Sequence, residues 1–378
     1  MWLPAAEALR RLNVKPQTLY ANVSRGRIRA KADPTEPRRS LYNSDDIDRL
    51  ARRTSGRPRS EAVAVEAINW GQPVLPSAVS TVANGRLFYR GQDVVALAES
   101  ASLEDIAALL WGGFSSLPSG TSHAGPEMGT GAALVALAER AAVDPPSGLR
   151  NPFALRADAS AILATVADAI MSPGAGRQHQ RLAAHFHRPA AADDLRATLV
   201  LLADHELNAS TFAARVTVST GASLAAGALA GLAALSGPLH GRASQAIAAL
   251  ADDLARGGAN PTDALREWLG EGRAVPGFGH RLYRDGDIRA TALLGRLHLP
   301  PAYAGLLDAA DAVLGERPNV DFALAALVAA HNLPETAPME IFALARSVGW
   351  LAHMLEQVES GALIRPRARY VGPRPAVT

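Results

Sequence analysis

The feature that most constrains the fold is a series of alanine- and leucine-rich segments in which apolar residues recur at the helical period of 3.6. These segments are residues 151–172, 192–206, 209–234, 241–256, 261–269, 302–314, 321–331 and 335–358. Strand-like alternation is rare, and aromatic residues make up only 5% of the chain. The sequence therefore predicts a mainly α body in which helices pack on helices.

The first 60 residues differ in charge from the rest of the chain. They carry 14 Lys and Arg against 6 Asp and Glu, whereas the remainder carries 24 against 30. A basic head on a mildly acidic body indicates two modules with different partners. The head's pattern predicts two short helices, two short strands and a third helix, at residues 2–12, 15–26, 27–30, 38–43 and 45–53, the last capped by Ser44.

This order resembles the winged helix-turn-helix heads of MerR-like and excisionase-like proteins. The resemblance implies a DNA partner for residues 1–53, with one helix in a major groove and arginines on phosphates. The alternative is a basic docking domain that does not bind DNA. Residues 52–62 are rich in Arg, Ser, Pro and Gly, and residues 54–68 are expected to be a linker.

Composition also excludes several kinds of site. The chain has no cysteine, which rules out disulfides, cysteine-based zinc sites and a cysteine nucleophile. The spacing of His179, His185 and His187 does not match a zinc pattern, so no metal site is expected. With no signal segment and no long uncharged apolar run, we expect a soluble cytoplasmic protein without a membrane partner.

Four polar segments interrupt the helical body. In "DHELNAST", His205 and Asn208 are candidate binding residues, or the segment is a helix end capped by Asn208 or Ser210. In "GPLHG", His240 is expected at the start of a helix, where the dipole keeps its imidazole neutral and suited to donate to a carbonyl. The alternative for His240 is a helix cap.

The other two segments supply a turn and a carboxylate. In "PGFGHRLYR", the glycines let a ligand approach the backbone, His280 follows, and nearby arginines suit an anion, unless this is a solvated basic loop. In "NVDF", Asp321 leads an apolar run, where lost hydration makes a carboxylate a stronger base. The alternative is a carboxylate that caps the helix. Arg346, on an apolar helix, is expected to face an anion.

Together these motifs resemble the citrate synthase family. "DHELNAST", "GPLHG", "PGFGHRLYR", "NVDF", "GWLAHMLEQ" and "RPRARYVG" occur in the family's order, and the likeness runs from about residue 70 to 372. The resemblance implies a homodimer of two-domain subunits. The large domain would comprise residues 69–226 and 336–378, and the small domain residues 227–335.

The resemblance also implies a C-acyltransferase that condenses acetyl-CoA with oxaloacetate, with no cofactor beyond this co-substrate. Asp321 would remove the methyl proton, His240 would stabilise the enol, and His280 would activate the ketone. The implied substrate-binding residues are His205, Asn208, Arg289, Arg346 and, from the partner subunit, Arg365. The implied CoA-binding residues are Val275, Pro276, Gly277, Phe278, Gly279 and Arg284.

Several positions depart from the family's pattern, among them Arg242, Ser244 and the stretch from Ala323 to Ala325. Arg242 would alter the preference for CoA ester or acid, and the stretch from Ala323 to Ala325 would reshape the pocket. Two alternatives therefore stay open. One is a 2-methylcitrate synthase that uses propionyl-CoA, since one methylene shifts preference by only about 1–3 kcal/mol. The other is a DNA-binding regulator whose body senses a metabolite.

Overall fold

The computed structural model describes residues 2–12, 14, 16–24, 28–33, 40–55, 75–113, 128–148, 150–171, 173–238, 240–241, 243–257, 260–271, 275–283, 285–366 and 372. The chain divides into two compact units, residues 1–76 and 77–378.

The first unit is a small α/β structure with its own core. Its elements are β1 (Trp2–Pro4), α1 (Ala5–Leu12), α2 (Pro16–Ser24), β2 (Ala30–Ala32), β3 (Ser40–Asn43) and α3 (Ser44–Ser55). The strands form an antiparallel sheet in the order β1-β3-β2. Six buried apolar side chains form the core, namely Ala8, Leu12, Leu19, Ile28, Tyr42 and Ile47.

Two local predictions for this unit were wrong. Residues 2–4 are a strand, not the first turn of a helix, because Trp2 pairs with Asn43 at the sheet edge and Leu3 is buried. The helix starts only after Pro4, which has no backbone N–H to donate. The cap of α3 is Asn43 rather than Ser44, because Asn43 Oδ1 accepts hydrogen bonds from the backbone N–H groups of Asp45 and Asp46.

The second unit begins with a small antiparallel sheet of β4 (Ser80–Ala83), β5 (Arg86–Tyr89) and β6 (Gln92–Asp93). Helices follow almost without interruption. The first group is α5 (Val94–Ser100), α6 (Leu103–Trp111), α7 (Thr130–Val143), α8 (Pro152–Ile170), α9 (Gln178–His185), α10 (Ala192–Leu202), α11 (Ala209–Ser219) and α12 (Leu224–Leu235), with a 3-10 turn at Pro189–Ala191. The second group is α13 (Ala243–Gly257), α14 (Pro261–Gly270), α15 (Ile288–Leu294), α16 (Pro301–Leu314) and α17 (Val320–His331).

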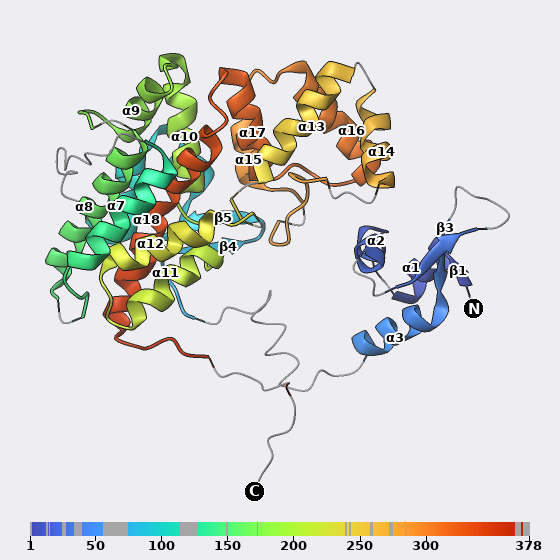
Figure 1. Ribbon diagram of the computed structural model, residues 1–378, viewed down its shortest axis with the longest axis horizontal. Helices are drawn as coiled ribbons and strands as arrows, with labels where there is room; N and C mark the ends of the chain where they lie inside the picture. The colour runs from blue at the N-terminus through green and yellow to red at the C-terminus, as the bar shows by residue number, and fades with distance from the viewer. Residues whose placement is uncertain are drawn as a thin grey trace, which may run out of the picture. The chain divides into compact units, whose positions relative to one another are not determined.

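The last helix, α18 (Ala337–Ser360), runs through the first group and packs on α6, α8, α10, α11 and α12 (Figure 1). Helices α13 to α17 pack mainly on one another, with α13 and α15 against α17 and α14 against α16. The prediction of a mainly α fold is confirmed.

The observed helix boundaries differ from those that the helical pattern predicted in two places. The segment predicted over 209–234 is two helices, α11 and α12, that pack on each other, because the chain turns at Gly221, whose φ is +87°. Helix α7 lies in a stretch for which the sequence pattern predicted no element. No helix among the described residues has the length and apolar character needed to cross a membrane.

Candidate active site

The turn that carries His205 is positioned by the small sheet. Helix α10 ends at Leu202, and the backbone N–H of Asp204 donates to the Tyr89 hydroxyl at 2.9 Å. The N–H of Glu206 donates to Ser80 Oγ at 3.0 Å. Strands β4 and β5 therefore hold both neighbours of His205, which is itself buried.

His205 links this turn to the loop that follows α14. Its Nε2 lies 2.9 Å from the Tyr283 hydroxyl, and its ring meets the His280 ring edge-on with centroids 5.2 Å apart. Burial lowers the pKa of His205 well below its usual value, and the charges of Arg289 and Arg346 act in the same direction. His205 is therefore a neutral imidazole at neutral pH.

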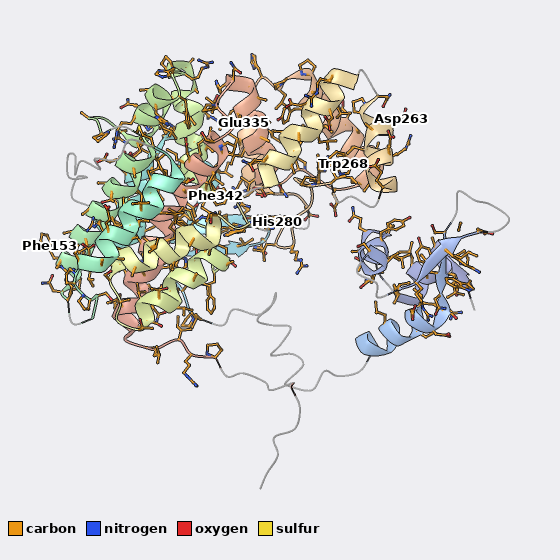
Figure 2. The ribbon with its side chains drawn as sticks, viewed as in Figure 1. Phe153, Asp263, Trp268, His280, Glu335 and Phe342 are labelled. Carbon is orange, nitrogen blue, oxygen red and sulfur yellow. The ribbon has the colours of Figure 1, made fainter. Side chains whose placement is uncertain are left out.

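His280 is held in one tautomer. The backbone N–H of Leu282 donates to His280 Nδ1 at 3.1 Å, so the proton of the neutral ring is on Nε2. Burial, together with the charge of Arg289, lowers the pKa of His280 to about 4. His280 thus offers an N–H donor at the place where the loop meets the first helical group (Figure 2).

The glycines before His280 bring this loop onto the start of α17. Gly277 and Gly279 have φ values of +85° and +72°, a region that favours glycine. The N–H of Asn319 donates to the carbonyl of Gly277 at 2.9 Å, and the N–H of Gly279 donates to the carbonyl of Arg317 at 2.8 Å. A side chain at Gly277 would also press on Ile247. The loop is therefore built to lie against the segment that carries Asp321.

Asp321 is not the cap of its helix. Asn319 Oδ1 accepts the N–H groups of Asp321 and Phe322, so the capping role belongs to Asn319. The alternative reading of Asp321 as a capping carboxylate is thus wrong. Burial raises the pKa of Asp321 to about 6, while the charge of Arg289 opposes that rise. The carboxylate is a stronger base than an exposed aspartate and is still ionised at neutral pH.

His240 lies in a turn three residues before α13, so its predicted place at a helix start was slightly wrong. Its Nε2 is 3.0 Å from Ser210 Oγ, which also accepts the indole N–H of Trp350 at 3.1 Å. The Ser210 proton can go to Asn208 Oδ1, at 2.7 Å, or to His240. When it goes to His240, the proton of the ring is on Nδ1.

The environment keeps His240 neutral. Burial lowers its pKa to about 4, and Arg346 contributes. Both residues contact Phe342 on α18, labelled in Figure 2. The His240 ring meets it with centroids 6.4 Å apart, and the Arg346 guanidinium lies 4.7 Å from its ring centre.

Two buried arginines complete the site. Arg289 donates to both oxygens of Asp287, at 2.9 and 2.7 Å, and the N–H of Val320 also donates to Asp287, at 3.1 Å. Arg346 donates from Nε to the carbonyl of Leu202 at 2.9 Å. Burial lowers the pKa of Arg346 to about 10, so it stays charged. Two buried guanidinium groups suit a ligand with more than one carboxylate.

Not every predicted site residue joins this cluster. Asn208 caps α11 through Oδ1, as the alternative reading held, and its binding role stays a prediction. Arg365 is exposed in the segment after α18, and Val275 and Pro276 lie partly buried in the loop before Gly277. Phe278 is buried against Phe322, with ring centroids 5.0 Å apart. Arg284 and Arg242 lie outside the described residues.

Sequence reasoning missed four residues that position the site, namely Ser210, Tyr283, Asp287 and Trp350. Tyr283 and Asp287 stand within the segment around His280, but no spacing rule pairs them with His205 or Arg289 in advance. Trp350 lies four residues after Arg346, on the same face of α18, and this helical spacing was a usable signal.

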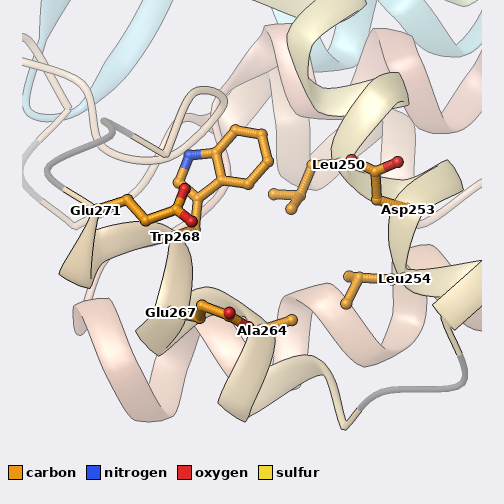
Figure 3. Close-up of a pocket in the computed structure, with 7 residues that line it drawn as sticks. All are labelled: Leu250, Asp253, Leu254, Ala264, Glu267, Trp268 and Glu271. Carbon is orange, nitrogen blue, oxygen red and sulfur yellow. The ribbon is translucent and has the colours of Figure 1, made fainter.

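A separate cavity of about 240 Å³ lies between α13 and α14 (Figure 3). Its walls are Leu250, Leu254, Ala264 and Trp268, with the carboxylates of Asp253, Glu267 and Glu271 around them. It contains none of the candidate site residues. Its three carboxylates would repel an anionic ligand, so this cavity is not the place where the buried arginines act.

Comparisons with known proteins agree with this geometry. The family model for the citrate synthase C-terminal domain matches residues 150–367. The chain is 31% identical over 350 residues to citrate synthase 2 of Bacillus subtilis, an alignment that covers 79% of this chain and 93% of that protein. It is 35% identical to 2-methylcitrate synthase 2 of Corynebacterium glutamicum over 195 residues, which cover 49% of this chain and only half (50%) of that relative.

A solved structure shows the same fold. The citrate synthase of Thermoplasma acidophilum, in ternary complex with carboxymethyl coenzyme A and oxaloacetate, superposes with a TM-score of 0.63 at 26% identity. The superposition covers 81% of this chain and 96% of that one. With the family model spanning more than half of its residues, this chain belongs to the citrate synthase family.

Proposed function

We propose that the protein condenses an acyl-CoA with oxaloacetate and releases CoA, with acetyl-CoA as the substrate and citrate as the product. The observation that carries this proposal is that a largely desolvated base and two neutral donors occur together. Asp321 has a pKa raised to about 6, whereas His240 and His280 have pKa values lowered to about 4. At neutral pH the site therefore holds one ionised base and two uncharged N–H donors.

These groups match the steps that the condensation needs. Asp321 takes a proton from the methyl group of the thioester, and the Nδ1–H of His240 donates to the enol oxygen that forms. The enol carbon attacks the ketone of oxaloacetate, and the Nε2–H of His280 delivers its proton to the new alkoxide. Water then cleaves the thioester of citryl-CoA to give citrate and CoA.

The arginines serve the second substrate in this proposal. Arg289 and Arg346 are buried, and no hydrogen bond is recorded for Nη1 of Arg289 among the described residues. A dicarboxylate between them would gain two charged donors in a desolvated site. The turn at Gly277 and Gly279 would let CoA approach the backbone. The complex of the Thermoplasma relative contains a CoA derivative together with oxaloacetate.

A direct assay tests the reaction. Purified protein should release CoA from acetyl-CoA only when oxaloacetate is present, and Asp321→Ala and His280→Ala should abolish the release. Glu335→Gln is a matched control, since Glu335 is an exposed carboxylate between α17 and α18 (Figure 2) and should leave the rate unchanged. Absence of CoA release with both acetyl-CoA and propionyl-CoA would refute the proposal.

The same assay decides the acyl group. Comparing kcat/KM for acetyl-CoA and propionyl-CoA separates a citrate synthase from a 2-methylcitrate synthase. The expected preference for acetyl-CoA need not exceed about 10- to 200-fold, because one methylene in an apolar pocket discriminates no better. A higher kcat/KM for propionyl-CoA would assign the alternative.

We also propose that the active form is a homodimer. Val143 on α7 and Phe153 on α8 are 79% and 74% exposed, and Figure 2 shows Phe153 on the outside of this helix group. Burial of these two side chains in a dimer interface would remove their apolar surface from water. If Arg365 reaches into the partner's site, mixed dimers of Asp321→Asn and Arg365→Ala subunits should regain one working site in two. Failure of mixing to restore activity would contradict this role.

The basic first unit supports a second candidate function, DNA binding through residues 1–53. Its helix α2 exposes Thr18, Tyr20 and Ser24, short polar and aromatic side chains that suit a groove. The full chain should retard DNA with an affinity that falls as salt rises, and a chain without residues 1–53 should not. Equal retardation by both chains would contradict this candidate.

A further inference from the structure

A buried acid–histidine pair lies beside the site and takes no part in the proposed chemistry. Asp204 and His353 are both fully shielded from solvent, and His353 Nε2 is 3.2 Å from Asp204 Oδ2. A carboxylate without water around it is unfavourable unless its partners replace the lost hydration. The groups that bond to the Asp204 carboxylate therefore indicate which part of the site it stabilises.

The tautomer of His353 follows from its other neighbours. Arg215 Nη1 lies 3.5 Å from His353 Nδ1, and the Ser77 hydroxyl is 3.4 Å from the same atom. A guanidinium group only donates, so Nδ1 accepts and the ring proton is on Nε2. His353 thus donates to Asp204. Arg215 is itself fixed by an ion pair to Glu356 at 2.9 Å.

Asp204 in turn holds the turn that carries His205. The Ser80 hydroxyl donates to Asp204 Oδ2 and accepts the N–H of Glu206, so one hydroxyl ties both neighbours of His205. Glu206 has a φ of +51°, a left-handed conformation that is unfavourable for a non-glycine residue. Such a conformation persists only where the surroundings impose it, and Asp204 is part of those surroundings.

Asp204 and Arg346 also interact electrostatically, and Arg346 donates a hydrogen bond to the carbonyl of Leu202, two residues before Asp204. Burial raises the pKa of Asp204, but His353 and Arg346 outweigh burial and the net pKa is lowered, so the carboxylate is ionised. Arg346, Gly349 and His353 are spaced along one face of α18, and Gly349 has no side chain to collide with Asp204. The helix therefore presents its arginine to the site and its histidine to the acid behind it.

We propose that Asp204 and His353 are positioning residues that hold His205 and Arg346 in the arrangement that binds the dicarboxylate substrate. This inference rests on the proposed function. It predicts a selective loss of oxaloacetate binding when the pair is altered, because the CoA-facing loop around Gly277 has no contact with the pair among the described residues.

The first test removes only the charge of the acid. Asp204→Asn should raise KM for oxaloacetate by about ten- to a hundredfold, the order expected for a shift of about 1 Å in a binding group, with KM for acetyl-CoA within about threefold of the parent. Asp168→Asn is the matched control. Asp168 is a buried acid paired with Arg181 at 2.6 Å, and like Asp204 it has one carboxylate oxygen without a partner in the described part of the chain.

The second test asks whether the hydrogen bond that His353 donates to Asp204 matters, or only the space that its ring fills. Gln at position 353 can donate to Asp204 and accept from Arg215, whereas Phe fills the space and can do neither. His353→Gln should stay within about fivefold of the parent in kcat/KM for oxaloacetate, and His353→Phe should resemble Asp204→Asn. If His353→Gln and His353→Phe are equally impaired, the hydrogen-bond role is wrong.

Thermal unfolding with and without oxaloacetate tests this inference through ligand binding alone. Its result does not depend on whether the protein catalyses the proposed reaction. A bound ligand raises the Tm of the native state, and this rise should shrink in Asp204→Asn but not in Asp168→Asn. If the parent releases no CoA, the proposed reaction fails, while a selective loss of the oxaloacetate-induced rise still supports the positioning role. If both variants keep the same rise or the same KM, the positioning role is overturned.

Discussion

Replacing the proposed base should make the protein inactive and, at neutral pH, more stable. Burial raises the pKa of Asp321 from 3.8 in the unfolded chain to about 6, so the folded state binds the proton more tightly. The stability that this carboxyl group contributes is fully present below pH 3.8 and is lost as the pH rises through about 6. Asp321→Asn keeps the shape of the side chain and never ionises, so it avoids this loss.

The size of the gain follows from the shift. A difference of about two pKa units corresponds to about 3 kcal/mol above pH 7. The Asp321 side chain is partly exposed, and solvent screens part of this penalty, so we expect a gain of about 1–3 kcal/mol. Near pH 4 the gain should approach zero, because the aspartic acid is then neutral like the amide.

Urea unfolding of both proteins across the pH range from about 4 to 8 measures the effect. Asp287→Asn serves as a control of opposite sign. Burial raises the pKa of Asp287, but Arg289 outweighs burial and the net pKa is lowered, so this variant should lose stability at neutral pH. If Asp321→Asn is less stable than the parent at pH 7, or its gain does not change with pH, the account of Asp321 as a desolvated base is wrong.

Three further outcomes are expected. Tyr283→Phe removes the hydroxyl that contacts His205 and should raise KM for oxaloacetate severalfold; an unchanged KM would contradict a role in binding. Ser210→Ala leaves the indole N–H of Trp350 unpaired and should lower stability by about 1–3 kcal/mol in urea unfolding, with a fall in kcat as His240 loses its partner. The kcat/KM of the free enzyme should fall about tenfold per pH unit below pH 6 as Asp321 takes up one proton, with no second limb near pH 6.5, because His240 and His280 have pKa values of about 4.

Helix content was readable from the sequence because periodicity reports which face of a segment is buried. Helix ends were less readable. The turn at Gly221 between α11 and α12 lies in the short segment Ser219–Ser223, and Ser223 caps α12, so a turn signal was present that the periodicity on either side obscured. Trp2 to Pro4 became a strand because its partner β3 lies about forty residues away, a pairing that local propensity does not encode.

The candidate site was also only partly predictable from the sequence. His240, His280 and Asp321 stood out because polar residues interrupt apolar segments at those points. Their electrostatic states did not follow from that pattern. Asp321 is a desolvated base because Asn319 takes the capping role, and His280 has one tautomer because of the N–H of Leu282. Both facts depend on local backbone geometry, which the residue types at these positions do not determine on their own.

Helix α18 shows how one element can serve both stability and the site. Arg346, Trp350 and His353 lie at helical spacings of four and three residues and contact the Leu202 carbonyl, Ser210 and Asp204 in turn. Each contact ends in a segment that flanks His205 or His240, so a rotation of α18 would disturb all of them together. Polar residues on an otherwise buried helix are unfavourable for packing alone. Their presence along one face is therefore consistent with the proposed role of α18 in holding His205 and Arg346 for substrate binding.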